Sequence, residues 1–232
     1  MEYQVNNSNL KNTWKILILP SALLLLVTVI FSLYYVFTLK GDGAAIGTEI
    51  SNSVPYILSI NYVLLLIIFF LFLYKDKIKF RQIGFTARGF TTDLIIGAMF
   101  GILIFLLTKF VFNPIFLNIG GNGFFNIKRD NGNLLLYIVS VVVLAPFAQE
   151  IIFRGYGVMK LQSKCGSIMA IIVTGVFFSL MHFGEGVGSM MIAFIVGCLL
   201  GFLFVRRKSM TANITANALS SLLTVLMLIL QI

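Results

Sequence analysis

Long apolar runs, separated by short polar segments, dominate the chain. A helix needs about 20 residues to cross the hydrocarbon layer, because each residue advances it by about 1.5 Å. Seven runs are long enough: Trp14–Leu39, Val54–Tyr74, Thr91–Phe112, Asn133–Leu161, Ser167–Phe183, Val187–Val205 and Ser209–Leu230. The pattern therefore predicts an all-α fold, a polytopic transmembrane helix bundle of about seven spans.

The segments around these runs carry signals of their own. Residues 1–13 read as a short, polar and disordered lead, and residues 14–232 as a single bundle. Lys75–Phe90 mixes basic and apolar residues, which is typical of a connector at the membrane interface. Asn113–Gly132 is rich in glycine and asparagine and predicts an irregular, exposed loop. Pro146 lies inside the fourth run and predicts a kink or an interruption of that helix.

Small residues within the runs are expected to pack helices together. Glycines recur four residues apart at two places, which permits close approach of two helices: Gly97 and Gly101, and Gly197 and Gly201. The two cysteines, Cys165 and Cys198, lack a paired spacing. We interpret them as packing residues rather than as a disulfide or as metal ligands.

The composition supports a membrane protein. Hydrophobic residues make up 59% of the chain, charged residues 11%, and the mean hydropathy is +1.01. A soluble domain of 232 residues could not hide so much apolar surface. Of the 17 Lys and Arg residues, 13 fall on the side of the N-terminus, leaving Lys40, Lys109, Lys128 and Arg129 on the other. The positive-inside rule then puts the N-terminus in the cytosol, and topology rather than nucleic-acid binding explains the net charge of +9.

Polar side chains also interrupt the later runs. A charged side chain at the bilayer centre costs at least about 2.5–3.5 kcal/mol, so each one needs a reason. The interrupting residues are Gln149, Glu150 and Arg154 in the fourth run, His182 (the single histidine) in the fifth, and Asn213, Asn217, Ser220 and Ser221 in the last.

Each of these groups has a purely structural interpretation. Glu150 and Arg154 stand four apart in the favourable order for an ion pair, which can simply staple the helix. His182 can be a satisfied core histidine, and asparagine and serine often join membrane helices by hydrogen bonds. However, Gln149 lies 16 residues before Cys165 and His182 lies 17 after it, so both lie roughly 24–26 Å from that turn. Asn217 reaches an overlapping depth from the turn before the last run, which predicts one shared site.

These polar residues, and their order along the chain, resemble the motifs of the CPBP family of intramembrane proteases. This family includes the type II CAAX prenyl endopeptidases and the bacterial Abi-type bacteriocin-immunity proteins. Its pattern is Glu-Glu-x-x-x-Arg on one span, Phe-x-x-x-His on the next, and His-x-x-x-Asn or a small polar residue on a later one. The matching segments are Gln149-Glu150-Ile-Ile-Phe-Arg154, Phe178-x-x-x-His182 and Asn217-Ala-Leu-Ser-Ser221. The resemblance covers about half the chain, from about Leu134 to the C-terminus, and the family-like core is expected at about 90–232.

The resemblance implies hydrolysis of a peptide bond in or near the membrane by a water that a glutamate and a histidine activate. The candidate catalytic residues are therefore Gln149, Glu150, Arg154, His182, Asn217 and Ser221. Two of them depart from the family pattern, because Gln149 replaces its first glutamate and Asn217 replaces its last histidine. An amide cannot act as a base at neutral pH. Glu150 differs from its neighbour by about 100° in direction and is expected to point toward Arg154. We predict that the chain, as written, is catalytically impaired.

Three functional hypotheses remain: an intramembrane endopeptidase with altered active residues, a non-catalytic immunity factor or scaffold that binds a membrane peptide, and a small transporter or channel whose pathway the buried polar residues line. The transporter is weakest, because the polar residues are confined to the later runs and no repeated halves are present. No metal cofactor is predicted, since a hydrolytic zinc site usually has about three His, Cys or carboxylate ligands. The expected partners are a membrane-embedded peptide or protein and the lipid bilayer. The expected location is a bacterial plasma membrane.

Overall fold

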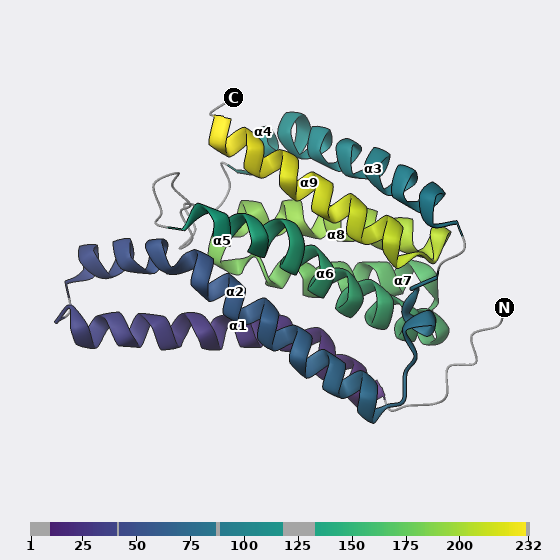
Figure 1. The fold of residues 1–232 in the computed structure, drawn as a ribbon, viewed down its shortest axis with the longest axis horizontal. Coiled ribbons are helices and arrows are strands. Elements are labelled where there is room, and N and C mark those ends of the chain that lie inside the picture. The colour runs from purple at the N-terminus through teal and green to yellow at the C-terminus, as the bar shows by residue number, and fades with distance from the viewer. Residues whose placement is uncertain (1–9, 41, 87–88, 118–132, 231–232) are drawn as a thin grey trace.

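The computed structural model describes residues 10–40, 42–86, 89–117 and 133–230, and in these ranges the chain is helical and forms no strand. The long helices lie side by side as a bundle (Figure 1). In chain order the elements are α1 (Leu10–Thr38), α2 (Gly43–Lys75), η1 (Phe80–Ile83), α3 (Phe90–Leu107), η2 (Thr108–Phe112), α4 (Asn113–Phe116), α5 (Leu134–Ile138), η3 (Val139–Leu144), α6 (Ala145–Gln149), η4 (Glu150–Val158), α7 (Met159–Leu180), η5 (Phe183–Glu185), α8 (Val187–Arg207) and α9 (Met210–Leu230).

The helices account for about seven membrane crossings. Six continuous helical segments in the described residues are long and apolar enough to span a bilayer, and one of them, Leu134–Leu180, has 47 residues. That segment reverses at Gly166, whose φ of 78° and ψ of 168° are not helical. The rings of Phe153 and Phe178 consequently lie only 5.6 Å apart although 25 positions separate them in the sequence. The segment is therefore a hairpin that supplies two crossings, as the sequence predicted.

Several predicted boundaries were wrong. Helix α1 begins at Leu10, so the end of the predicted lead is helical, while residues 1–9 lie outside the described part. Helix α2 begins at Gly43, well before Val54, because the side chain of Asp42 accepts hydrogen bonds from the first backbone N–H groups of the helix.

The loop predicted at Asn113–Gly132 starts with the short helix α4, and residues 118–132 lie outside the described part. The fifth span was also drawn too long, since α7 ends at Leu180. His182 therefore lies in the turn that follows α7 and not within a helix.

Pro146 distorts its helix, as predicted. The π-helical segment η3 comes directly before the proline, and a second one, η4, begins at Glu150. Proline lacks an N–H group and its ring crowds the preceding turn, so a wider turn accommodates it. Segments of this kind occur frequently at functional sites, and here η4 carries Glu150 and Arg154.

Both glycine pairs pack helices within the chain. A Cβ atom at Gly101 would lie 2.6 Å from the backbone oxygen of Ala216, so α3 lies directly against α9. One at Gly197 would lie 3.2 Å from the Cα of Gly175, which joins α8 to α7. The packing interpretation of the cysteines holds for Cys198, whose sulfur fills the space beside Gly175. It fails for Cys165, which is exposed near the hairpin turn.

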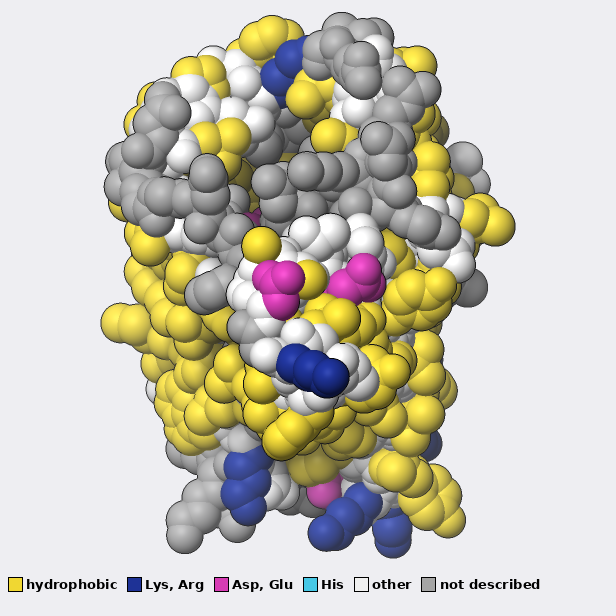
Figure 2. All heavy atoms as spheres, turned by 90° about the vertical axis from the view of Figure 1, so that its left-hand side faces the viewer, with side chains coloured by type: hydrophobic (Ala, Val, Ile, Leu, Met, Phe, Trp, Pro, Cys, Tyr) yellow, Lys and Arg dark blue, Asp and Glu magenta, His cyan; other side chains and the backbone are white. Residues whose placement is uncertain are grey.

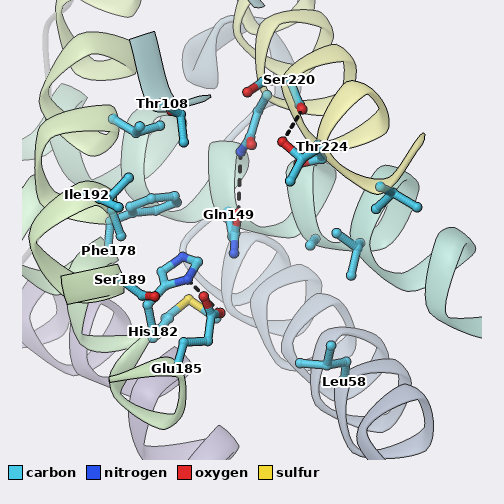
Figure 3. A pocket seen from close by; sticks show the side chains of 18 of the residues that line it. Leu58, Thr108, Gln149, Phe178, His182, Glu185, Ser189, Ile192, Ser220 and Thr224 are labelled. Carbon is cyan, nitrogen blue, oxygen red and sulfur yellow. Dashed lines mark hydrogen bonds and ion pairs between the residues drawn. The ribbon is translucent and has the colours of Figure 1, made fainter. Parts of the chain in front are cut away.

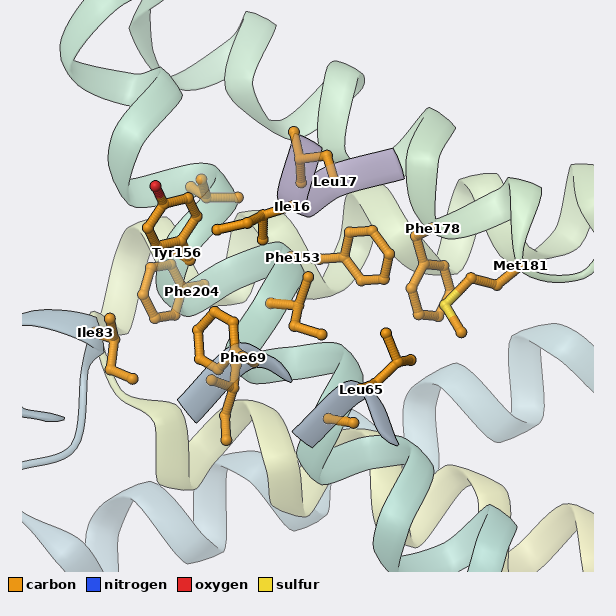
Figure 4. Packing of buried hydrophobic residues seen from close by; sticks show 14 of the residues in the cluster. Ile16, Leu17, Leu65, Phe69, Ile83, Phe153, Tyr156, Phe178, Met181 and Phe204 are labelled. Carbon is orange, nitrogen blue, oxygen red and sulfur yellow. The ribbon is translucent and has the colours of Figure 1, made fainter. Parts of the chain in front are cut away.

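Hydrophobic side chains fill the interior and also cover the outside. Figure 4 shows aromatic rings from α2, η4, α7 and α8 packed into one core cluster, with Phe153 and Tyr156 fully buried. Seen from the left-hand side of Figure 1, hydrophobic side chains also cover much of the outer surface (Figure 2), and Phe37 and Ile168 are 79% and 77% exposed. An apolar exterior around a packed interior fits a lipid solvent. The chain is an integral membrane protein.

The connector between α2 and α3 is docked onto the bundle rather than lying free at the interface. Ile83 in η1 is fully buried, and the backbone oxygen of Gly84 accepts a hydrogen bond of 2.8 Å from the N–H of Met210. The start of the last helix is thereby fixed next to η4, which positions α9 against the residues of the first motif.

Candidate functional site

A cavity of about 390 Å³ lies among the helices of the bundle. Gln149, His182, Asn217 and Ser221 line it together with residues of α2, α3, α5 and α8 (Figure 3). Four of the six predicted catalytic residues therefore share one cavity, as the depth argument required. The other two, Glu150 and Arg154, are fully buried and do not line it.

Both polar atoms of the Gln149 side-chain amide are hydrogen-bonded. Its Oε1 accepts a hydrogen bond of 3.3 Å from Nδ2 of Asn217, and its Nε2 donates one of 3.1 Å to the hydroxyl of Tyr62. The orientation of both amides follows from Glu150, whose Oε1 accepts a 2.8 Å hydrogen bond from the same Nδ2. A carboxylate only accepts, so Asn217 must present its N–H group and Gln149 must present its oxygen to Asn217.

Glu150 lies outside the cavity lining and accepts three hydrogen bonds. Besides the bond from Asn217, its Oε1 accepts one of 3.0 Å from Arg154, and its Oε2 accepts one of 3.1 Å from Asn213. Both charged side chains of the pair are within 1% of complete burial. The prediction that Glu150 points toward Arg154 is confirmed, and the carboxylate is enclosed by donors rather than exposed to the cavity.

Arg154 connects the first motif to the second. Its Nη2 donates a hydrogen bond of 2.9 Å to the backbone oxygen of Gly197. Its guanidinium group lies 4.6 Å from the ring centroid of Phe178, a cation–π contact. The Phe178 ring in turn lies 5.4 Å from that of His182. The phenylalanine of the second motif, Phe178, thus contacts both the buried ion pair and the histidine in the cavity.

His182 forms a pair with Glu185, a residue that the sequence analysis did not single out. The His182 Nδ1 lies 2.8 Å from Oε1 of Glu185, as the dashed line in Figure 3 shows. Since the carboxylate accepts, Nδ1 carries a proton, whereas the buried Nε2 contacts no hydrogen-bond partner among the described residues. Burial lowers the pKa of His182, but the charge and the hydrogen bond of Glu185 outweigh it, and the net shift is upward.

The last motif enters the cavity in the register chosen from the sequence. Asn217 and Ser221 line the cavity, together with Ser220 and Thr224. Asn213 instead donates to Glu150 and to the backbone oxygen of Leu200. A register that started at Asn213 and ended at Asn217 would have placed its first residue outside the cavity.

Two residues of the site were missed. Tyr62 comes from α2, where two polar residues of the apolar run, Ser59 and Asn61, were signals of the inward face that the sequence analysis did not use. Glu185 did carry a signal, since it is an acid three positions after the single histidine, at the end of an apolar run.

The described residues do not fit a zinc site. Nowhere in the part of the chain that the structure describes do three His, Cys, Asp or Glu side chains come together. His182 and Glu185 are two ligands at most, and they are bonded to each other. The absence of a catalytic metal stays a prediction.

The bundle encloses a cavity with polar groups among helices that are long and apolar enough to cross a membrane. Residues 131–223 match the model of the Rce1-like family, described as type II CAAX prenyl endopeptidase Rce1-like. The match covers the segment with all three motifs and supports the resemblance of this segment to the CPBP family. No curated protein and no solved structure is significantly similar to the chain.

Proposed function

We propose that the chain binds a peptide segment of a membrane protein in this cavity and, as written, hydrolyses it negligibly. One observation carries the proposal: an amide, Gln149, occupies the position of the family's first glutamate, and both of its polar ends are hydrogen-bonded within the protein. The family's general base is therefore replaced by a group that cannot take a proton from water.

The neighbouring groups do not replace that base. Glu150 is fully buried and already accepts hydrogen bonds from Arg154, Asn213 and Asn217. Oxyanion stabilisation requires free donors that point at the reacting atom. Asn217 instead donates its N–H groups to Gln149 and Glu150. His182 is retained, but the glutamate with which it would share the water is missing.

The cavity supports binding. It combines apolar side chains such as Leu58 and Ile192 with hydroxyl and amide groups from Ser189, Ser220 and Gln149. Such mixed linings with a few convergent polar groups are typical of ligand sites. An extended peptide offers both apolar side chains and backbone donors and acceptors, which matches this lining.

Reversal of the two departures tests the loss of activity. The parent chain and the double variant Gln149→Glu/Asn217→His are reconstituted in liposomes with a library of membrane peptides, and cleavage is followed by mass spectrometry. A general base contributes about 10²–10⁴-fold, so the parent should show no cleavage above background and the double variant should show cleavage. Each single reversion should recover less than the pair, since residues that act as one unit are not additive.

His182→Ala in the double variant is the control, and it should abolish the recovered cleavage. Clear cleavage by the parent would refute the assignment of Gln149 as the lost base. A folded but inert double variant would show that the cavity is no longer a protease site, and would leave the binding role alone.

The second candidate function is an intramembrane endopeptidase that works with altered residues, and the family match favours it. A non-catalytic immunity factor or scaffold, located in a bacterial plasma membrane, is the form of the binding role that the resemblance suggests. The cleavage assay separates these two functions, because only the endopeptidase turns over peptide without reversion.

A further inference from the structure

The charge of the cavity comes from one pair of residues. Among the described residues that line it, Glu185 and His182 alone carry side chains that are charged near neutral pH. The remaining polar groups are amides and hydroxyls, including those of Gln149, Ser189 and Thr224. The buried ion pair of Glu150 and Arg154 lies outside the cavity lining and is neutral as a unit.

Glu185 is accessible, whereas the deep polar groups are not. Its side chain is 42% exposed, compared with 25% for His182. One carboxylate oxygen receives the hydrogen bond from His182, and none of the described residues donates to the other oxygen. Deeper in the cavity, by contrast, Tyr62, Gln149 and Asn217 satisfy one another. A ligand therefore meets an available charge at Glu185 and nowhere else in the described lining.

From this placement we propose that the cavity selects a peptide segment that carries a cationic group, a lysine or arginine side chain or an N-terminal amine, next to Glu185. The inference rests on the proposed binding function and names the chemistry of its ligand. The apolar lining takes the neighbouring side chains of the segment, and Glu185 pairs with the cation. A carboxylate that is only partly exposed, at the edge of an apolar cavity, attracts a cation more strongly than one in free solution, because the local dielectric is lower.

His182 adjusts this attraction with pH. When its imidazole is protonated, it neutralises Glu185, and the pair attracts a cation weakly. When it is neutral, the carboxylate keeps its full charge. The other groups that face Glu185 are the phenol rings of Tyr62 and Tyr137 and the amide of Gln149, which are uncharged near neutral pH. The preference for a cation should therefore increase as the pH rises through the pKa of His182, which the carboxylate raises.

The test uses the full chain in nanodiscs of phosphatidylcholine, so that the lipid adds no net charge. The probes are two fluorescent leucine–alanine peptides that differ at one position, lysine in one and uncharged norleucine in the other. The variants are Glu185→Gln, which keeps the size and the hydrogen bond but removes the charge, and Glu49→Gln as the matched control. Glu49 lies in the first turns of α2 and does not line the cavity.

The parent and Glu49→Gln should bind the lysine peptide about threefold to tenfold more tightly than the norleucine peptide, as expected for a partly screened ion pair. Glu185→Gln should bind both peptides equally. The lysine preference of the parent should grow between about pH 6 and about pH 8.

Three outcomes would overturn the proposal. A preference that survives in Glu185→Gln would show that the cation binds elsewhere. Equal binding of both peptides by the parent, abolished when Ala193→Phe fills the cavity, would refute the charge selection but keep the proposed binding function. Failure of the parent to bind either peptide would refute both.

Discussion

Arg154→Ala should destabilise the protein strongly. The variant removes the 3.0 Å hydrogen bond to Glu150, the 2.9 Å hydrogen bond to the backbone oxygen of Gly197 and the 4.6 Å stacking contact with Phe178. Glu150 would remain fully buried as a carboxylate without a counter-charge, since the other two donors are the neutral amides of Asn213 and Asn217. Removal of one partner from a buried ion pair costs about 3–5 kcal/mol.

A second ion pair supplies the matched control. Arg207 donates to Asp93 over 2.6 Å, a shorter contact than that of Arg154, but its side chain is 36% exposed. If distance alone determined the contribution, Arg207→Ala would be the more damaging variant. Because water can replace the exposed partner, we expect Arg207→Ala to lower the free energy of unfolding by only about 1–2 kcal/mol.

The assay is unfolding of the detergent-solubilised variants in increasing denaturant, followed by circular dichroism and by the loss of monodisperse protein on size exclusion. The expected order of stability is parent, then Arg207→Ala, then Arg154→Ala. An Arg154→Ala protein as stable as the parent would refute the argument, because it would mean that Glu150 is hydrated or finds another partner. If Arg154→Ala cannot be purified in any detergent, Arg154→Lys takes its place in the comparison. This variant keeps the charge but loses the planar set of donors, so its stability should lie between those of the parent and Arg207→Ala on one side and complete loss of the fold on the other.

Three further predictions follow from the fold and the site. Topology reporters fused after Lys79 and after Gly121 should give opposite signals, cytosolic for the first, and two cytosolic signals would contradict the seven-span topology. Gly101→Val should destabilise the bundle by about 1–3 kcal/mol in the same unfolding assay, because a Cβ atom there already meets the backbone of α9 at 2.6 Å, and an unchanged stability would mean that α3 and α9 are not in contact. Tyr62→Phe leaves Nε2 of Gln149 without its acceptor and should lower the free energy of unfolding by about 1–3 kcal/mol, whereas a combined Tyr62→Phe/Gln149→Leu variant should recover part of it.

The helical rise explains why so much of the site could be predicted. Each residue of a helix advances by a constant distance, so spacings from a turn convert to depths, and Gln149 and Asn217 do meet at 3.3 Å. The angular step between neighbours likewise predicted that Glu150 turns away from the position of Gln149 and toward Arg154. Both arguments use local geometry, which the sequence determines directly.

The features of the site that the sequence did not predict depend on contacts between helices, which local geometry does not determine. Apolar residues dominate the second half of α2, and no clear helical periodicity indicated that Tyr62 would face the cavity. The end of α7 fell before His182, and the turn that follows brought Glu185 back to the imidazole. Likewise, the start of α2 was missed because the prediction followed the apolar run from Val54, whereas the cap at Asp42 begins the helix at Gly43.

The sharing of Glu150 between two helices has a consequence for the order of assembly. Arg154 lies on the same helix and can pair with Glu150 as soon as that helix forms, whereas Asn213 and Asn217 arrive only with α9. During synthesis the carboxylate of Glu150 therefore has only Arg154 as a donor until α9 is in place. Without α9, Glu150 would keep a buried charge with one donor in place of three, so docking of α9 completes the solvation of this carboxylate.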